Sequence, residues 1–179
     1  MKHKILPITK KADIPKAYRR NPIGLLLEYH NLNRPFEDCS EAKLLIGMCM
    51  DNRKYLHIPD NFAFIIRSGG GNLRYSEFKV SYAIGVGKVR HIALIGHDHC
   101  AMVNLISRKK EFIKGLVQRA GWSKSAAEEH FMNLAPMHEI GNAIDFVASE
   151  ANRLQAKYPK VEVAPFYYGM EDNLLYGIR

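Results

Sequence analysis

Two short motifs place metal-binding and charged side chains directly after apolar stretches of the chain. They are Cys-Met-Asp-Asn-Arg at residues 49–53 and Gly-His-Asp-His-Cys at residues 96–100. Two thiolates and one imidazole form a borderline-soft donor set that suits a tetrahedral zinc ion. Three protein ligands leave one position open, which is typical of a catalytic rather than a structural zinc site. Cys49, His97 and Cys100 are therefore the candidate zinc ligands.

A cysteine at the end of a strand also has a simpler explanation. Free cysteine is among the most buried residue types, so Cys49 alone favours a small core side chain. The charged residues that follow change this balance, because Asp51 and Arg53 are costly at a buried strand end unless they pair with each other or with a site. The chain has 3 cysteines, and an odd, low count argues against a disulfide framework. Cys39 precedes the core stretches and is interpreted as a bystander.

The apolar stretches have the length of buried strands. Residues 44–50, 62–66 and 91–95 are apolar without alternation, as expected for parallel strands covered on both faces. Helical spacing and capping signals predict helices over 76–84, 101–119, the segment after Ser123, and 141–157. Two-fold alternation is also arguable over 76–84. Residues 161–168 and 174–178 predict two closing strands joined by a turn. Strands that alternate with helices predict an α/β fold with a mostly parallel sheet flanked by helices.

The predicted topology brings the two motifs together. In open parallel sheets, ligands bind just beyond the carboxyl ends of the strands, and both motifs lie at such ends. The length of 179 residues, 47% of them hydrophobic, is that of one domain with its own core. We divide the chain into an N-terminal arm, residues 1–42, which is basic, broken by prolines and predicted to lie outside the core, and a single catalytic domain, residues 43–179.

Composition and charge exclude several classes of protein. No apolar run approaches the roughly 18 residues that span a bilayer, and no secretory signal is present, so a soluble cytoplasmic protein is expected. The net charge of +8 favours an anionic substrate or partner. The basic residues are spread along the chain without interleaved aromatic residues, which argues against nucleic acid. Dinucleotide and phosphate-loop fingerprints are absent from the sequence.

In order and spacing, the motifs from about Lys43 to Met102 resemble the β-class carbonic anhydrases, in particular the compact members of that family. The hallmark of the family is C-x-D-x-R after the first strand and H-x-x-C after a later one, with a glycine-containing loop between them, here Arg-Ser-Gly-Gly-Gly at residues 67–71. The resemblance implies one zinc ion per chain on the three candidate ligands. It implies a zinc lyase that reversibly hydrates carbon dioxide to bicarbonate, with zinc hydroxide as the nucleophile. It also implies a homodimer or higher oligomer, with the 1–42 arm packed on a partner subunit.

The resemblance assigns roles to the neighbouring residues. Asp51 would accept a hydrogen bond from the zinc hydroxide, and Arg53 would keep Asp51 ionised and turned to the metal. If Arg53 let go, Asp51 could swing onto zinc, an inactive state found in part of the family. The run Gly69, Gly70 and Gly71 is either a flexible turn or a substrate-binding backbone that approaches a small molecule closely.

Departures from the family pattern bear on substrate choice more than on metal binding. Asp98-His99 lies between the H-x-x-C ligands, and Ala101 replaces the glycine that usually follows them. His99 is either a proton shuttle or a structural histidine. The other histidines that lack partner spacing, His30, His57, His130 and His138, are predicted in surface or capping roles.

Two alternative functions are kept beside carbon dioxide hydration. The first is hydrolysis of COS or CS2 on the same scaffold. The second is a non-catalytic zinc protein that binds anions through its basic surface.

Overall fold

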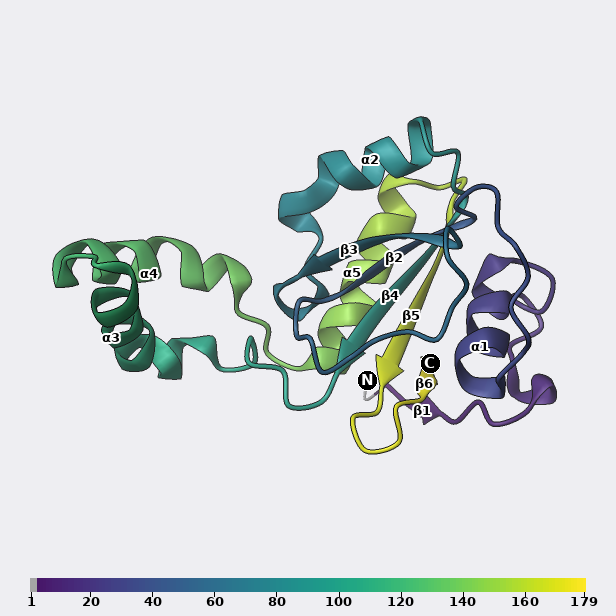
Figure 1. Cartoon of the computed structure of the whole chain (residues 1–179), viewed down its shortest axis with the longest axis horizontal. Coiled ribbons are helices and arrows are strands. Elements are labelled where there is room, and N and C mark those ends of the chain that lie inside the picture. The colour runs from purple at the N-terminus through teal and green to yellow at the C-terminus, as the bar shows by residue number, and fades with distance from the viewer. Residues whose placement is uncertain (1–2) are drawn as a thin grey trace.

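A six-stranded sheet forms the centre of the computed structural model, which describes residues 3–179 (Figure 1). Its strand order is β1-β6-β5-β4-β2-β3. The strands are β1 (Ile5–Leu6), β2 (Leu44–Cys49), β3 (Ala63–Ser68), β4 (His91–His97), β5 (Glu162–Tyr168) and β6 (Leu175–Ile178). Four neighbouring strands, β3, β2, β4 and β5, run parallel, with β3 at one edge of the sheet, while β6 and β1 add antiparallel pairs at the other edge. The predicted α/β class with a mostly parallel sheet is confirmed.

Helices cover both faces of the sheet. The five helices are α1 (Pro22–Leu32), α2 (Glu77–Gly85), α3 (Lys109–Ala120), α4 (Lys124–His138) and α5 (Ala143–Lys157), of which α1, α2 and α5 lie against the sheet. Short 3-10 turns lie at Lys11–Asp13, Gly69–Gly71, Arg74–Ser76 and Leu105–Arg108. On one face, α1 packs over Leu44 and Ile46 of β2. On the other, α2 and α5 pack over Leu45 of β2 and Leu94 of β4. All residues of β2 are buried, which explains its unbroken apolar pattern.

The N-terminal segment belongs to this core, so the prediction of an arm outside it is wrong. Ile23, Leu26 and Leu27 of α1 have no exposed surface and pack with the sheet. Asn21 caps the helix by accepting hydrogen bonds from the backbone N–H groups of Ile23 and Gly24 at 2.9 and 3.2 Å. Prolines and basic residues dominate the composition of residues 1–42, but one apolar helix face is enough to dock the segment. Its contact with a partner subunit stays a prediction.

The helix expected at residues 101–119 begins later than predicted. The residues after Cys100 form a turn that is held by the segment after α4. There, the Ile140 N–H donates to the Met102 carbonyl at 3.0 Å. Asn104 then adopts a left-handed φ of 55°, which interrupts helical geometry until the turn that precedes α3. Gly121 ends α3 with a φ of 71°, and Ser123 caps α4, as the sequence predicted.

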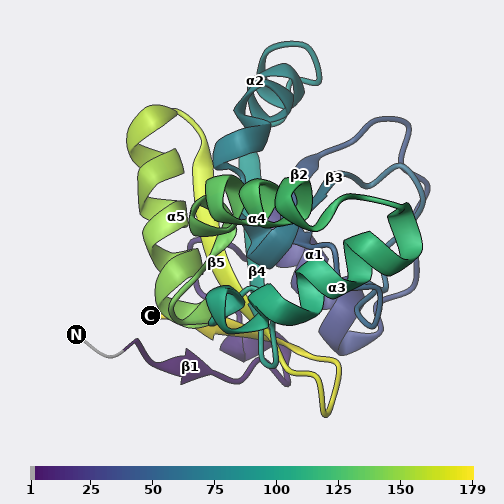
Figure 2. The same cartoon turned by 90° about the vertical axis from the view of Figure 1, so that its left-hand side faces the viewer.

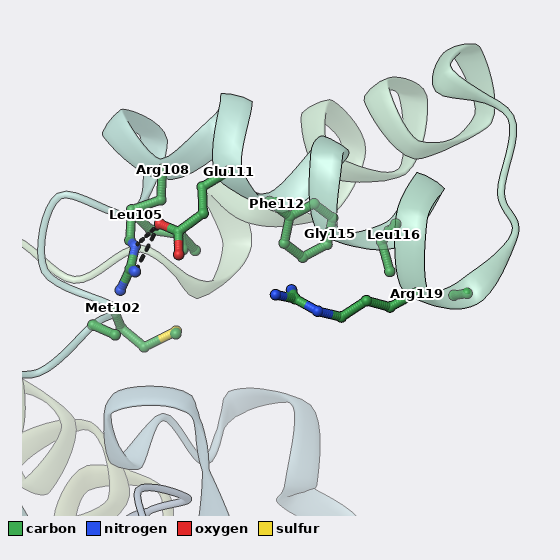
Figure 3. Close-up of a pocket in the computed structure, with 10 residues that line it drawn as sticks. Met102, Leu105, Arg108, Glu111, Phe112, Gly115, Leu116 and Arg119 are labelled. Carbon is green, nitrogen blue, oxygen red and sulfur yellow. Dashed lines mark hydrogen bonds and ion pairs between the residues drawn. The ribbon is translucent and has the colours of Figure 1, made fainter.

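Together α3 and α4 form a lobe that projects away from the sheet (Figures 1 and 2). A cavity of about 430 Å³ lies along α3, lined in part by Met102, Phe112 and Arg119 (Figure 3). The side chain of Arg108 reaches Glu111 beside it at 2.7 Å. The lining contains no thiol or imidazole, and the carboxylate of Glu111 in it is paired with Arg108. Within residues 3–179, no helix is both long and apolar enough to cross a membrane.

An ion-pair network joins α2 to α5 behind the sheet. Glu150 of α5 has no exposed surface and binds Arg153 through both carboxylate oxygens, each at 2.8 Å. Arg74 approaches the same carboxylate at 3.3 Å, and Glu77 of α2 pairs with Arg153 and Lys157. The buried carboxylate is thus neutralised from both sides, which a buried charge requires.

Candidate metal centre

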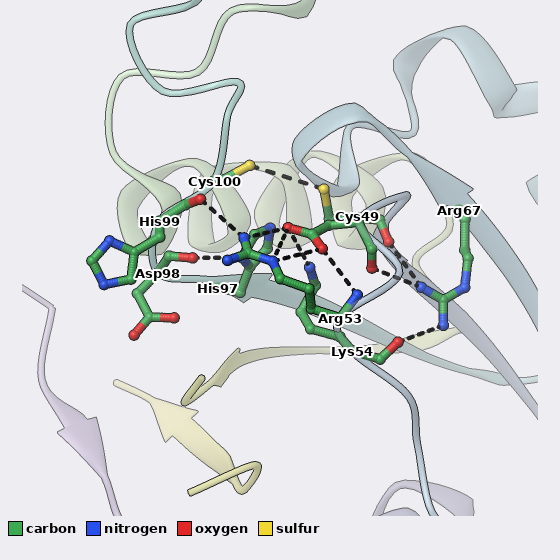
Figure 4. Close-up of polar contacts among 9 residues, drawn as sticks. Cys49, Arg53, Lys54, Arg67, His97, Asp98, His99 and Cys100 are labelled. Atoms are coloured by element: carbon green, nitrogen blue, oxygen red, sulfur yellow. Dashed lines mark hydrogen bonds and ion pairs between the residues drawn. The ribbon is translucent and has the colours of Figure 1, made fainter. Parts of the chain in front are cut away.

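The structure brings the three predicted ligand residues together at the carboxyl ends of neighbouring strands. Cys49 is the last residue of β2, His97 is the last of β4, and Cys100 follows in the next turn. Because β2 and β4 are adjacent and parallel, with Met48 opposite Ile95, both ends reach the same edge of the sheet. The ligand atoms of the three residues all lie within 4.8 Å of one another, and all three residues are buried (Figure 4).

The distances and free valences of this group fit a metal ion. The two sulfur atoms lie 3.9 Å apart, and two thiolates on one tetrahedral zinc ion, with bonds near 2.3 Å, are separated by about 3.8 Å. The Nδ1 atom of His97 lies 2.6 Å from the carbonyl oxygen of Asp98, to which it can donate. Its Nε2 is then an acceptor, and it is buried without a hydrogen-bond partner among residues 3–179. Bonding to a metal ion would satisfy this orphaned nitrogen, with the carbonyl fixing the ring from behind.

The two thiols titrate as a pair. The hydrogen bond from Cys100 lowers the pKa of Cys49, and contacts with His97 and with the backbone N–H groups of Asp51 and Gly70 lower it further, against the effect of burial. The same hydrogen bond raises the pKa of Cys100, and burial adds to that rise. The pair therefore holds one proton between two sulfur atoms. A divalent cation would displace that proton and bind two thiolates.

The carboxylate of Asp51 is held by Arg53. The Arg53 side chain donates from Nε to Oδ1 at 3.0 Å and from Nη2 to Oδ2 at 2.6 Å, and its backbone N–H donates to Oδ1 at 3.0 Å. These bonds hold the pKa of Asp51 well below its usual range, although burial opposes them. Asp51 is thus an ionised acceptor at neutral pH. Both of its oxygens face Arg53, and it is not part of the Cys49, His97 and Cys100 group.

Arg67 and the glycine run support the loop that carries Cys49. From the end of β3, Arg67 donates to the carbonyl oxygens of Cys49 and Lys54 at 3.2 and 2.9 Å (Figure 4). Gly70 and Gly71 adopt left-handed φ values of 63° and 74°. A Cβ atom at Gly70 would lie 2.9 Å from Cδ1 of Ile140, so the backbone packs too closely there for a side chain. The run lies beside Cys49, and its role in substrate binding stays a prediction.

A groove gives small molecules access to this edge of the sheet. It has a volume of about 370 Å³ and is lined in part by His97, Asp98, Cys100 and Tyr167. Burial, helped by the carboxylate of Asp98, raises the pKa of Tyr167 to about 12, so its hydroxyl stays protonated. The ring of His99 points away from the two sulfur atoms (Figure 4), and His99 is exposed.

The burial of two basic residues, Lys54 and His30, was not predicted from the sequence. Lys54, directly after Arg53, has a side chain only 1% exposed, with its Nζ 3.4 Å from Oδ2 of Asp51. His30, predicted in a surface or capping role, is buried in α1 and accepts a hydrogen bond from the backbone N–H of His57 at 3.0 Å. Burial lowers the pKa of His30 to about 4. The only signal for Lys54 was a third charged residue after a buried strand, and His30 had no signal.

Comparison with solved structures identifies the fold. β-Carbonic anhydrase isoform I of Trichomonas vaginalis superposes with a TM-score of 0.63 at 14% identity, over 80% of this chain and 87% of that one. A carbonic anhydrase of Streptococcus mutans gives 0.60 at 15% identity, over 88% and 95%. The apo form of a carbon disulfide hydrolase gives 0.54 at 16% identity, over 75% and 77%. No protein-family model and no curated protein sequence matches the chain.

A parallel α/β sheet with a buried Cys-His-Cys group at its carboxyl edge defines a potential metal centre at the usual ligand-binding position of such sheets. The superpositions define the fold further: the chain has the β-carbonic anhydrase fold. That scaffold carries both carbonic anhydrases and a carbon disulfide hydrolase.

Proposed function

We propose that this protein is a zinc enzyme that reversibly hydrates carbon dioxide to bicarbonate, with one zinc ion per chain on Cys49, His97 and Cys100. The observation that carries the proposal is the buried ligand group itself, in which the sulfur spacing of 3.9 Å and the unpaired Nε2 of His97 suit a tetrahedral ion. The likeness of the fold to carbonic anhydrases supports the same activity. Free thiols at the centre need a reducing compartment, which supports a cytoplasmic location.

Zinc, when bound, supplies a Lewis acid that lowers the pKa of a water molecule and so provides a nucleophile at neutral pH. The chain supplies the orientation. Asp51, which is ionised and therefore only an acceptor, fixes the direction of the O–H bond of the nucleophile and so aims its lone pair at the carbon of the substrate. Arg53 holds Asp51 in that state through its paired donors.

Proton release and substrate positioning fall to neighbouring groups. His99, exposed directly before Cys100 with its ring turned away from the two sulfur atoms (Figure 4), is the candidate side chain for passing a proton to solvent. The backbone of Gly69, Gly70 and Gly71 lies close enough to Cys49 to approach a small linear substrate without a side chain in between.

Hydrolysis of COS or CS2 is the second candidate, and the superposition on a carbon disulfide hydrolase favours it. The two activities separate when one zinc-loaded preparation is assayed with CO2, COS and CS2 in parallel, with metal-free protein as the background. We expect saturable hydration of CO2 with the highest kcat/KM of the three. Turnover of a sulfur compound without hydration of CO2 above the metal-free background would contradict the proposal. Absence of turnover with all three would favour a non-catalytic, anion-binding zinc protein.

We also propose that the protein self-associates. Four large apolar side chains of the segment around α2 share one face at helical spacing and are at least half exposed: Tyr75, Phe78, Tyr82 and Val86. The opposite face of α2 is buried against the sheet. An exposed apolar stripe of this kind is typical of an interface. Light scattering should report at least twice the chain mass of 20.4 kDa, and Phe78→Glu should lower the mass. A monomeric parent at micromolar concentration would contradict self-association.

A further inference from the structure

The side chain of Lys54 is a buried charge beside the metal centre. It is only 1% exposed, yet its Nζ has no hydrogen-bond partner in the part of the chain that the structure describes, residues 3–179. The nearest acidic oxygen, Oδ2 of Asp51, lies 3.4 Å away, beyond the 2.7–2.9 Å that is usual for a charge-assisted hydrogen bond. A buried ammonium without an acceptor is costly, so its position calls for a function.

Lys54 is not needed to neutralise Asp51. Arg53 already engages both oxygens of that carboxylate with its side chain and one of them with its backbone N–H. The backbone of Lys54 is fixed by Arg67, which donates to its carbonyl at 2.9 Å. The loop therefore holds the ammonium inside, beside Asp51 and next to the ligand group (Figure 4).

The charges of the loaded centre do not balance. Two thiolates, Cys49 and Cys100, neutralise a divalent ion, and His97 is neutral as a ligand. Asp51 and Arg53 neutralise each other. Lys54 is left over, so this set of side chains, with a divalent ion, carries one surplus positive charge; the carboxylate of Asp98 lies outside the set, in the groove beside His97. Burial lowers the pKa of Lys54, and the charges of Cys49 and Asp51 offset only part of that effect.

We propose that Lys54 sets how tightly the metal centre holds small monovalent anions, because its buried ammonium adds a positive charge beside Asp51 and the ligand group. The inference rests on the metal centre proposed above. An anion bound to an ion on Cys49, His97 and Cys100 would be attracted by the charge of Lys54, and that attraction would be lost without Lys54. Lys54 thus sets how tightly the product and competing anions are held.

The expected size of the effect follows from Coulomb's law. Two unit charges roughly 10 Å apart, at the effective permittivity of about 20 that suits sites in proteins, interact strongly enough to change a dissociation constant about ten-fold. Removing the charge of Lys54 should weaken anion binding by about that factor. The field of Lys54 suffices for this effect, since the ammonium need not touch the anion.

Cobalt-substituted protein gives a direct readout, because the visible absorption of the ion reports an added ligand. Thiocyanate is titrated into the parent, into Lys54→Met, which keeps the length of the side chain without its charge, and into Lys110→Met. Lys110 is exposed on α3, so its loss matches the change in net charge away from the centre. We expect a dissociation constant about ten-fold higher for Lys54→Met and an unchanged constant for Lys110→Met.

A dissociation constant unchanged in metal-loaded Lys54→Met overturns the inference. So does an equal rise in Lys110→Met, because the effect would then come from net charge alone. If Lys54→Met does not retain one ion per chain, Lys54→Gln replaces it. If that variant also fails, a parent that binds thiocyanate no more tightly than roughly 0.1 M overturns the inference.

Kinetic measurements distinguish a failure of this inference from a failure of the proposed function. In bicarbonate dehydration, Lys54→Met should raise KM about ten-fold, whereas Lys110→Met should leave KM unchanged. A parent that binds thiocyanate through Lys54 but does not hydrate CO2 would refute the proposed function and leave the inference standing.

Discussion

Replacing Asp51 by asparagine tests whether the chain orients a nucleophile or only binds a metal. The change keeps the size of the side chain but removes its charge, and it turns one acceptor into an N–H donor. That donor would face Nε and Nη2 of Arg53, which now lie 3.0 and 2.6 Å from the two oxygens. The amide must therefore rotate away from the position in which the carboxylate is held.

The expected loss of activity is large, and it is accompanied by a loss of stability. Removal of one preorganised, charge-assisted hydrogen bond to a reacting group lowers turnover roughly ten- to a thousand-fold. Arg53 is 54% exposed and can be rehydrated, so loss of the exposed pair costs at most about 1 kcal/mol of unfolding free energy. Lys54 loses its nearest acid, which adds about 1–3 kcal/mol. Zinc binding should persist, since Asp51 is outside the ligand group.

Stopped-flow CO2 hydration, normalised to the measured zinc content, is the assay. Arg53→Ala should lose activity by a similar factor, because it frees the carboxylate of Asp51, and the double variant should be little worse than either single one, since both act on one group. Arg20→Ala, which removes an exposed arginine far along the sequence from the site, serves as the control. If Asp51→Asn binds zinc and hydrates CO2 at the parent rate, the orienting role is refuted.

Three further predictions concern stability. The pKa of His30 is about 4 in the folded protein and 6.5 when free, so the unfolded chain binds the extra proton. The free energy of unfolding should therefore fall by about 3 kcal/mol between pH 6.5 and 4. Denaturant titrations at both pH values should show a smaller fall for His30→Gln, and an equal fall would contradict the assignment. Glu150→Gln should lower the free energy of unfolding by about 1–3 kcal/mol, measured by urea titration, because Arg153 loses its carboxylate partner; an unchanged midpoint would be inconsistent with the network. Gly70→Ala should lower the free energy of unfolding by about 1–2 kcal/mol, since its Cβ would lie 2.9 Å from Ile140 and strain a left-handed turn. It should also weaken zinc binding in a competition with a chelator. An unaltered zinc affinity would show that Gly70 does not support the centre.

Local rules were enough to predict the elements that position the metal centre. Residues 44–49 form a strand buried on both faces, and an unbroken apolar run of that length has few other uses. The Ser123 cap depends only on its own side chain, which accepts from the Ala126 N–H at 3.1 Å. Because parallel strands end at one edge, the meeting of Cys49 with His97 and Cys100 also followed from topology.

The features that were not predicted correctly from the sequence depend on contacts between distant segments. The 1–42 segment was judged by composition, whereas α1 is held by packing against β2 and β4. The turn after Cys100 is fixed by Ile140, far along the chain. Burial of Lys54 and His30 likewise results from the closing of loops over them, and no spacing in the sequence encodes it. Single buried polar residues are therefore the part of a site that sequence periodicity predicts worst.

We propose above that the protein hydrates CO2 with a single zinc ion on Cys49, His97 and Cys100. Its most direct test is the CO2 hydration rate of metal-free protein as zinc is added stepwise. We expect a linear rise that stops at one equivalent per chain in the parent and in Cys39→Ser, whose thiol packs in the core with α1, apart from the ligand group. We expect no comparable rise in Cys100→Ser. A rate that does not respond to zinc, or a Cys100→Ser variant that follows the parent curve, would contradict it.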